Sequence, residues 1–526
     1  MAETAAEQEE VLTDLEIVTG AKEPKPKIGD VKAPELTGSI KVPKIQPGAA
    51  AGYKPYPAAP EYMEGMDFPT TLVDNWEKEA VNKLGELLKK YKSLQDYMDI
   101  CVRCGSCTDK CQFFLGSKDP KNMPVARADL LRKVYKKYFT TEGKLLGKIA
   151  GAERFDLELL GEWFSYFHQC SQCRRCSVFC PYGIDTAEIS MAAREIMDHI
   201  GVGQKYVNSI IIKLHEIGNN LGMNPKALKA TLESTEEDIE EEDGVPVKLP
   251  VDQVGADILM VTPSADFFAS PHVESLIGYA KVFHQAGISW TFSSTASEAG
   301  NFGMFIGNYS HMQRAASRIR KAIEEIRPKR LIVGECGHAW RIAYSFWNTL
   351  IGPLDQSLGL DPKYPRPQHI CEFTLDLVKR GAIKLDKSAN DEFVPTFHDS
   401  CNVARGSRMG DSPGGQFDIP RELIKASCNR YVDMEQETIM EKTFCCGGGG
   451  GLLTDEILDV RLQGAMPRMQ AYQNIKDSHG ANFFALICAI CKAQFTKVFP
   501  KYGMPMIEVG GVHQLVGRAI ELGAKE

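Results

Sequence analysis

The sequence lacks the features of a membrane-spanning, secreted or nucleic-acid-binding chain. It contains no run of about 18 apolar residues, so we expect no membrane-spanning helix. The acidic, polar stretch at residues 1–20 has no apolar segment of the kind found in secretory signals. The net charge of −8 gives no electrostatic support for nucleic-acid binding. We therefore expect a chain that works in the reducing cytoplasm.

The sequence also lacks a Gly-x-Gly-x-x-Gly loop after a predicted strand, the pattern that binds flavin and nicotinamide dinucleotides. Flavin chemistry would therefore lie on another chain. Cysteine, in contrast, is abundant, with 16 residues that mostly stand two or three positions apart. Such spacing favours metal ligation over the long-loop disulfides of secreted proteins.

Length and pattern divide the 526 residues into several units. Residues 1–65 are rich in Pro, Lys and Ala, which predicts an extended N-terminal arm, either a free tail or a segment that orders on a partner. Residues 66–200 read as a helical domain, with helices over 70–99 and from Asp185 to Ile200. An acidic run at 236–243 marks 201–254 as a solvated linker, with a docking patch as the alternative. Two α/β halves are expected over 255–385 and 386–526.

Two cysteine runs dominate the helical domain. Each run has four cysteines, and the same spacing of three, three and four residues recurs in both. The members are Cys101, Cys104, Cys107 and Cys111 in the first run, and Cys170, Cys173, Cys176 and Cys180 in the second. Pro181 follows the last of them, as it does in bacterial ferredoxins.

This repeated pattern resembles the cysteine run of two-cluster bacterial ferredoxins. In those proteins the fourth cysteine of each run ligates the other cluster. The resemblance therefore implies a crossed ligand assignment. One cubane [4Fe-4S] cluster would take Cys101, Cys104, Cys107 and Cys180, and the second would take Cys170, Cys173, Cys176 and Cys111. A pair of four-cysteine zinc sites is the alternative, although zinc sites usually use two separated cysteine pairs.

A third group of cysteines lies near the C-terminus. Cys445 and Cys446 are adjacent and precede five glycines that begin at Gly447. Cys401 lies upstream, and Cys488 and Cys491 lie downstream. Because glycine permits close approach of the backbone, we expect the run to admit something bulky, and the cysteines favour an iron-sulfur centre.

The region beyond residue 255 alternates between short buried strands and helices, which predicts parallel α/β folding. In the first half we expect strands at 257–262, 288–292 and 331–334 and helices at 273–287 and 312–326. In the second half we expect strands at 393–397, 430–434 and 482–487 and helices at 421–427 and 460–475. The two halves read as a repeat. Of the five motif cysteines, only one has a counterpart in the first half, Cys336, so we expect that half to hold no metal.

The C-terminal pattern resembles the cysteine-rich CCG domain of heterodisulfide reductases. Its position behind a two-cluster ferredoxin module resembles the HdrD-type catalytic subunit. Within that family, the segments 334–339 and 398–405 and the Pro-rich arm are most similar to the DsrK group of the DsrMKJOP complexes. The implied fold is a helical ferredoxin-like domain followed by a tandem α/β CCG repeat whose first half is degenerate.

The resemblance implies a noncubane [4Fe-4S] centre that reduces, or in reverse oxidises, a disulfide or trisulfide. Its ligands would be Cys401, Cys445, Cys446, Cys488 and Cys491, with Gly447 beside the cluster. Cleavage of a sulfur–sulfur bond takes two electrons, whereas a ferredoxin-type cluster carries one. A relay must therefore end at a centre that holds a half-reduced sulfur species, and soft iron–sulfur bonding suits this task.

The implied partners are a membrane cytochrome b subunit of the DsrM type, other subunits of the complex, and a small DsrC-type sulfur carrier as substrate. The chain would then be cytoplasmic and bound peripherally to the inner face of the cell membrane in dissimilatory sulfur metabolism. One alternative is a heterodisulfide reductase of small thiol coenzymes. Another is a pure electron-transfer subunit of a flavin dehydrogenase, like the glycolate oxidase iron-sulfur subunit.

Single residues near these motifs have two interpretations each. His338 and His398 flank the predicted site and are candidates to protonate a leaving thiolate, or they are structural histidines. Cys336 reads as an inert buried thiol rather than a reactive one. Arg174 and Arg175 read as surface residues, although their charges would raise a nearby cluster potential. Arg405 would either steer an anionic substrate or form a buried ion pair.

Overall fold

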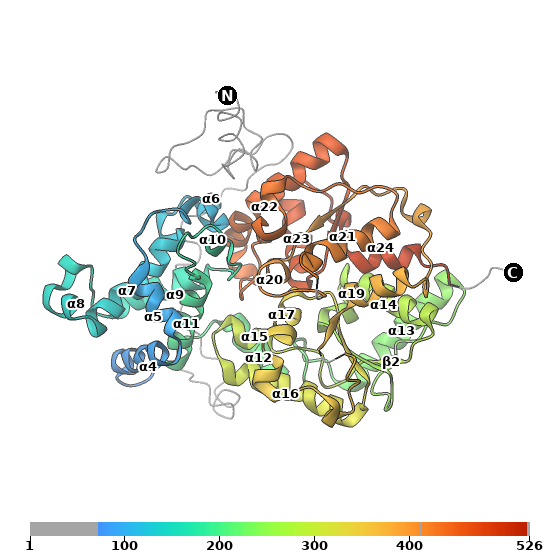
Figure 1. Ribbon diagram of the computed structural model, residues 1–526, viewed down its shortest axis with the longest axis horizontal. Helices are drawn as coiled ribbons and strands as arrows, with labels where there is room; N and C mark the ends of the chain where they lie inside the picture. The colour runs from blue at the N-terminus through green and yellow to red at the C-terminus, as the bar shows by residue number, and fades with distance from the viewer. Residues whose placement is uncertain (1–71, 365, 411, 523–526) are drawn as a thin grey trace.

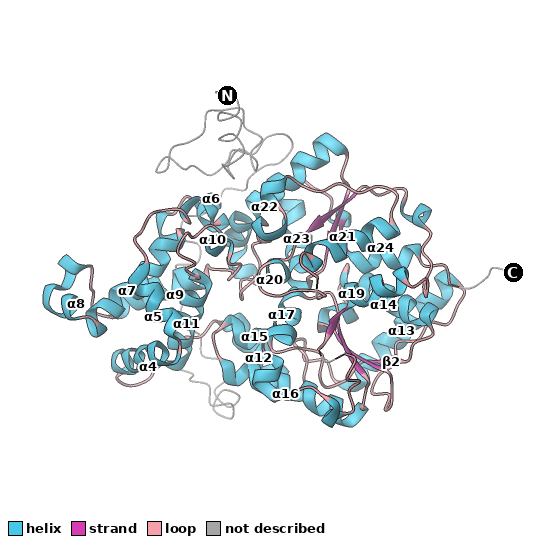
Figure 2. Ribbon diagram, viewed as in Figure 1, coloured by secondary structure: helices cyan, strands magenta, loops and turns pink. Residues whose placement is uncertain are grey.

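Three parts follow one another along the chain in the computed structural model, which describes residues 72–364, 366–410 and 412–522 (Figure 1). The arm predicted over 1–65 falls outside the described residues. Most of the described chain is helical, and two small parallel sheets lie within the C-terminal two thirds (Figure 2). No helix in this described part is long and apolar enough to cross a membrane.

The helical module contains the two ferredoxin-like cysteine runs. Its helices are α4 (Trp76–Lys90), α5 (Lys92–Ile100), α6 (Gln112–Ser117), α7 (Pro124–Phe139), α8 (Thr141–Leu146), α9 (Leu157–His168), α10 (Arg175–Val178) and α11 (Thr186–His199). The stripe predicted as a single helix over 70–99 forms two helices, because Tyr91 adopts an extended backbone with φ −114° between α4 and α5. Asp185 caps α11 at the predicted start of this helix, since its side chain accepts a hydrogen bond from the N–H of Ala187.

The residues expected to form a linker are mostly helical. They contain α12 (Lys205–Glu216) and α13 (Pro225–Asp243). Asn224 caps α13 and Gly244 ends it in the left-handed conformation. Leu228, Leu232 and Ile239 are buried in the core of the next unit, so the acidic run belongs to a packed helix and not to an irregular linker. The sequence pattern missed this because acidic residues dominate the last turns of the helix and hide its narrow apolar stripe.

The first α/β unit is built on a parallel sheet with the order β2-β1-β3-β4. Its strands are β1 (Ile258–Val261), β2 (Trp290–Thr291), β3 (Arg330–Val333) and β4 (Gln368–His369). Its helices are α14 (His272–Ala286), α15 (Asn301–Phe305), α16 (Tyr309–Ile326), α17 (Gly337–Ser345), α18 (Trp347–Ile351) and α19 (Ile370–Lys379). The predicted strands and helices of this half are confirmed to within a few residues, and β4 was not predicted.

The second α/β unit has a parallel sheet with the order β5-β6-β7. Its strands are β5 (Pro395–His398), β6 (Phe483–Leu486) and β7 (Val509–Gly511). Its helices are α20 (Cys401–Ala404), α21 (Gly415–Ser427), α22 (Leu458–His479), α23 (Ala489–Lys501) and α24 (Val512–Ala519). The strand predicted at 430–434 is wrong. Only the N–H of Val432 reaches strand β5, at Pro395 O, and the segment continues as a loop.

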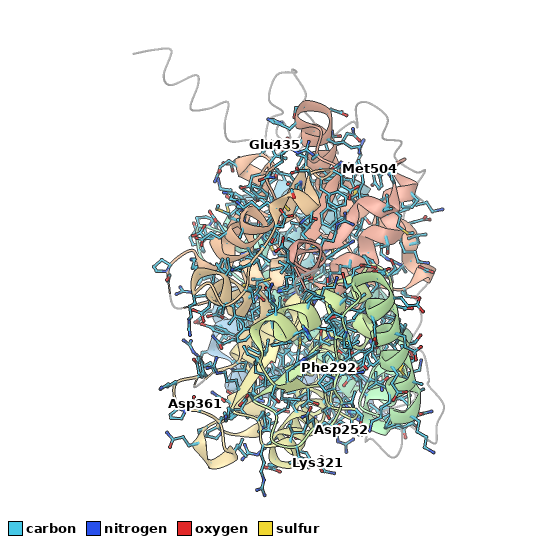
Figure 3. The ribbon with its side chains drawn as sticks, turned by 90° about the vertical axis from the view of Figure 1, so that its right-hand side faces the viewer. Asp252, Phe292, Lys321, Asp361, Glu435 and Met504 are labelled. Carbon is cyan, nitrogen blue, oxygen red and sulfur yellow. The ribbon has the colours of Figure 1, made fainter. Side chains whose placement is uncertain are left out.

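The two α/β units share one hydrophobic core. Phe397 and Phe483 of the second unit belong to the same buried cluster as Leu259 and Ile332 of the first. Figure 3 shows the second unit, with Glu435 and Met504 labelled, stacked on the first, which carries the labels Asp252, Lys321 and Asp361. The segments that follow the strands meet between the units, where a Cβ on Gly337 would lie 2.3 Å from Ser400 Oγ.

The helical module packs on the second unit through α6 and α22. A Cβ on Gly116 would lie 2.1 Å from the carbonyl oxygen of Gln463, and one on Gly464 would lie 2.4 Å from the Phe113 ring. Glycine at these two positions therefore lets the helices touch. This contact brings the second cysteine run of the module beside the glycine run of the second unit.

Candidate metal centres and thiol site

The eight cysteines of the helical module line two cavities. The outer cavity is lined by Cys101, Cys104, Cys107 and Cys180, and the inner cavity by Cys111, Cys170, Cys173 and Cys176. Cys176 also borders the outer cavity. The structure thus places the fourth cysteine of each run with the first three cysteines of the other run, as the resemblance to ferredoxins implied.

The donor set of both cavities fits a thiolate-bound cluster. All eight cysteines are free thiols. Burial, together with the neighbouring Cys101 and Cys180 sulfurs, raises the pKa of Cys107 to about 12. Burial, with the sulfurs of Cys173 and Cys170, also raises the pKa of Cys111. Crowded, buried thiols of this kind need a bound cation to become thiolates together.

The two runs have left-handed residues at the same two positions. Arg103 and Gln172, each the third residue of its run, have φ values of 57° and 56°. Gly105 and Arg174, each the fifth residue, have φ values of 84° and 63°. Left-handed residues beside right-handed ones turn successive N–H groups toward one point, an arrangement common around iron-sulfur clusters. Both loops are therefore shaped to surround an anionic group.

The cysteines of the C-terminal pattern form a third group at one edge of the second sheet. Cys401 follows β5, and Cys488 and Cys491 follow β6. Since β5 and β6 are parallel, their carboxyl ends lie at the same edge, which explains why distant cysteines meet. The loop with Cys445 and Cys446 reaches the same place, and all five side chains are buried.

The five thiols form a continuous set of sulfur contacts. Cys445 lies within hydrogen-bonding contact of Cys401 and Cys446, and Cys491 contacts both Cys446 and Cys488. Hydrogen bonds with Cys445 and Cys491 lower the pKa of Cys446 well below its usual value. Hydrogen bonding with Cys445, followed by burial, raises the pKa of Cys401. Cys446 and Cys488 are thus disposed to be thiolates, whereas Cys401 and Cys491 would need a bound cation to lose their protons.

The glycine run is closely packed rather than open. The N–H groups of Gly447 and Gly448 point at the sulfurs of Cys445 and Cys446, at 3.4 and 3.5 Å. Gly447 has φ 88°, and a Cβ there would lie 2.7 Å from the Arg461 carbonyl oxygen. Neighbouring protein therefore takes the space that we expected a bulky substrate to use at this glycine. The run serves close packing and N–H contacts to sulfur.

The structure places both candidate histidines against thiols of this group. His338 Nδ1 lies 3.6 Å from Cys488 Sγ, and His398 Nε2 lies 3.6 Å from Cys491 Sγ. Both rings are buried, and the second nitrogen of each has no hydrogen-bond partner among the described residues. Burial, together with the nearby Arg468, lowers the pKa of His398 well below its usual value, which keeps this ring neutral.

Two thiol contacts were not predicted from the sequence. Cys336, which we expected to be inert, contacts Cys488 and so adds a thiol from the first unit to the group. Cys173 of the inner cavity contacts Cys445, which joins the two sites directly. Gln112 also reaches Cys173, with its Nε2 3.5 Å from the sulfur. The position of Cys336 directly after a buried strand was the signal that would have placed it at the sheet edge.

Two arginines differ from their predicted roles. Arg405 forms neither an ion pair nor an open anion site among the described residues, because its guanidinium donates to backbone carbonyls, including that of Cys173 at 2.6 Å. Arg175 is fully buried rather than on the surface, and its guanidinium lies 3.8 Å from the centre of the Phe444 ring. Both side chains tie the second cysteine run to the loop that precedes Cys445.

A buried ion pair supports the thiol site from behind. Lys492, the residue after Cys491, lies 2.7 Å from Glu335, the residue before Cys336, and neither side chain is exposed. His513 completes the group at 2.8 Å from Glu335. Although burial opposes it, Lys492 and His513 hold the pKa of Glu335 well below its usual value. The pair fixes the two α/β units against each other at the site.

These features define a class, namely an iron-sulfur oxidoreductase subunit with a dicluster ferredoxin module joined to a buried thiol site. The family model of the 4Fe-4S dicluster domain matches residues 97–184. The chain is 40% identical over 480 residues to the Hdr-like menaquinol oxidoreductase iron-sulfur subunit 2 of Archaeoglobus fulgidus, covering 86% of this chain and 85% of that protein. The corresponding subunit of Archaeoglobus profundus is 39% identical over the same shares.

A more distant relative is the HdrD protein of Methanosarcina mazei, which belongs to the dihydromethanophenazine:CoB–CoM heterodisulfide reductase. It is 24% identical over 434 residues, which cover 81% of this chain and 95% of that protein. The chain belongs to the family of Hdr-like menaquinol oxidoreductase iron-sulfur subunits, which is related to the HdrD proteins of heterodisulfide reductases. It is therefore an iron-sulfur oxidoreductase subunit.

Proposed function

We propose that this chain is the DsrK-type subunit of a quinol-linked membrane complex and that it reduces a sulfur–sulfur bond. The outer and inner cavities would each hold a cubane [4Fe-4S] cluster, and the five C-terminal cysteines a noncubane one. Bound there, the clusters supply one-electron transfer and, at the third site, a soft metal for sulfur. The observation that carries this proposal is the junction of the two sites, where Arg405 donates to the carbonyl oxygen of Cys173 at 2.6 Å and a Cβ on Gly450 would lie 3.0 Å from that of Cys170.

The exposure of the three sites supports a direction of electron transfer, from the outer cavity to the thiol site. Cys104 of the outer cavity is exposed, whereas Cys445 and Cys488 are fully buried. Electrons would enter at the outer cavity from a DsrM-like cytochrome b partner and leave at the thiol site. The two Archaeoglobus relatives are menaquinol oxidoreductase subunits by name, which supports a quinol as the electron source. The chain would then be held at the cytoplasmic face of the membrane by its partners.

His338 has the geometry to move a proton at the thiol site. Cleavage of one sulfur–sulfur bond consumes two electrons and two protons and releases two thiols. His338 Nδ1 contacts Cys488, and its Nε2 lies beside Gly449, where an added Cβ would be 3.3 Å away. The Nε2 atom has no partner in the described part of the chain. A thiolate released at the Cys488 end of the thiol group would take its proton from this ring.

A DsrC-type sulfur carrier is the substrate that we favour. The chain is 40% identical to a menaquinol oxidoreductase subunit but only 24% identical to a protein of the CoB–CoM heterodisulfide reductase. This difference favours a substrate other than a heterodisulfide of small coenzymes. The bond reduced would be a disulfide or trisulfide of the carrier's C-terminal cysteines.

Electron paramagnetic resonance of the anaerobically purified chain tests the site. The chain is oxidised with and without the thiol form of a DsrC-like protein, and Cys445→Ser is measured beside it. We expect a new paramagnetic signal that requires both the carrier thiol and Cys445. If only ordinary cubane signals appear, and neither the carrier thiol nor Cys445→Ser changes them, the proposal is contradicted. A pure electron-transfer subunit would then be favoured.

Substrate choice needs a second measurement. The chain is reduced with dithionite, mixed with a DsrC-like trisulfide or with the CoB–CoM heterodisulfide, and the released thiols are counted. We expect thiol release from the carrier protein and little from the coenzyme. The reverse result would place the chain with the small-molecule reductases.

A further inference from the structure

Uncompensated positive charge surrounds the inner cavity. Arg194 is 1% exposed, and its guanidinium donates only to backbone carbonyls. The acceptors include Phe167 at 2.7 Å, Cys170 at 2.6 Å and Gly450 at 2.7 Å. No carboxylate in the described ranges lies within ion-pairing distance of it, which is unusual for a buried arginine. The side chain thus carries a full charge beside Cys170.

Two more arginines repeat this arrangement. Arg127, also 1% exposed, donates to the carbonyl of Tyr166 at 2.7 Å and to Asn122 Oδ1 at 2.9 Å. Its side chain lines the inner cavity together with Cys111 and Cys170. Arg405 donates to the carbonyl of Cys173, as described above. Neither forms an ion pair with a carboxylate in the described part of the chain.

Arg174 differs, because its ion pair with Asp185, at 2.9 Å, adds no net charge to the inner cavity.

The outer cavity is surrounded differently. Arg103 forms an ion pair with Asp129 at 3.0 Å, and its side chain is 52% exposed. Arg132, which lies close to Cys101, is bound to the same carboxylate. Solvent and Asp129 together offset much of this positive charge. The two cavities therefore differ in how far carboxylates and solvent offset the positive charge around their cysteines.

We infer that Arg127, Arg194 and Arg405 raise the reduction potential of a cluster in the inner cavity above that of a cluster in the outer cavity. The inference rests on the proposed function, since it requires a cluster in each cavity. An added electron makes a cluster more negative, and buried positive charges that are poorly screened stabilise that reduced form. An electron that enters at the outer cavity would then come to rest beside Cys445.

Redox titration of the full chain, followed by electron paramagnetic resonance, tests this inference. Cys104→Ser assigns the outer signal and Cys173→Ser the inner one. In Arg194→Gln and Arg127→Gln we expect the midpoint potential of the inner signal to become more negative while the outer one stays unchanged. Arg194→Lys and Arg127→Lys keep the charge and should shift it much less. Arg103→Gln is the matched control and should leave the inner potential unchanged.

The outcomes separate this inference from the proposed function. Wild-type chain with fewer than two cubane signals would contradict the proposed function itself. Two outcomes would overturn only the inference while both cubane signals are present. In the first, the midpoint potential of the inner signal is unchanged in both Gln variants. In the second, it shifts by the same amount in the Gln and Lys variants. If Arg194→Gln fails to fold because it loses its contacts to three parts of the chain, Arg127→Gln decides, since its contacts stay within the helical module.

Discussion

The two α/β units share a core and meet at the ends of their strands, yet they contribute different chemistry to one site. The second unit supplies five thiols, whereas the first supplies Cys336, His338 and the carboxylate of Glu335. A unit without its own metal pattern can therefore still complete a site. Its contribution is a thiol, a ring nitrogen and a buried charge placed against the cysteines of its neighbour.

Two buried aspartates, one in each α/β unit, have different hydrogen-bond partners. Asp399 of the second unit accepts two hydrogen bonds from Arg421, both at 2.8 Å. Asp266 of the first unit has no such ion pair in the described chain and is bound by the hydroxyl of Thr262. Asp399 is thus neutralised by a cation, whereas burial raises the pKa of Asp266 to about 7.

The largest expected effect comes from replacing one cysteine of the thiol site in each α/β unit and comparing the two variants. Cys445→Ser should abolish turnover and the thiol-dependent signal, because Cys445 contacts Cys401, Cys446 and Cys173. Cys336→Ser should keep the iron of this site, because five thiols remain. Iron analysis and spectroscopy of both variants check this. Loss of the iron in Cys336→Ser would make the first unit a full partner in metal binding.

Removal of the ion pair between the units should have the next largest effect. Lys492→Met leaves Glu335 buried with one cation fewer, which should lower the free energy of unfolding by about 3–5 kcal/mol. Lys497→Met is the matched control, because its pair with Asp455 is 3.5 Å long and exposed, and it should cost less than about 1 kcal/mol. Anaerobic urea denaturation measures both. An equal loss of unfolding free energy in the two variants would show that the Lys492–Glu335 pair does not hold the units together.

The histidine of the first unit should matter more for proton transfer than that of the second. His338→Gln should lower turnover by about 10²-fold, because the ring that faces Gly449 would no longer supply a proton. The cubane signals should remain. His398→Gln should have a smaller effect on turnover, since this ring is fully buried and its pKa is depressed. Steady-state rates with equal cluster content check this, and a larger loss in His398→Gln would reverse the assignment.

Per pH unit, the smallest expected effect is a pH dependence of stability from Asp266. Burial raises the pKa of this carboxyl to about 7, against an ordinary value of 3.8. Between these values the unfolded chain releases the proton while the folded chain keeps it. Stability should therefore fall as the pH rises through this window, by at most about 1.4 kcal/mol per pH unit.

Asp266→Asn should flatten this part of the stability curve, and Glu241→Gln, an exposed site on α13, should leave it unchanged. Urea denaturation at several pH values measures the slope. An unchanged slope in Asp266→Asn would show that the acid is ionised in the folded chain.

Spacing and periodicity in the sequence were enough for the features that depend on neighbouring residues. The two ferredoxin-like runs, the strand at 258–261 and the helix over 458–479 follow from residues a few positions apart. The resemblance to the CCG domain also implied that the five C-terminal cysteines lie together, as they do in the structure. Their role as ligands stays a prediction. The strand predicted at 430–434 is wrong, because a single backbone hydrogen bond joins that segment to strand β5.

Only the tertiary structure decided which side chains from distant segments meet. The contact between Cys173 and Cys445 joins residues of two modules, and Cys336 reaches Cys488 across the two α/β units. Arg194 binds carbonyls of three separate segments, a role that no local pattern indicates. Cysteine spacing indicates what kind of group a loop can hold, because the ligands that one loop supplies must all reach the same group. Burial and charge around that loop depend on packing between modules, which is a property of the whole fold.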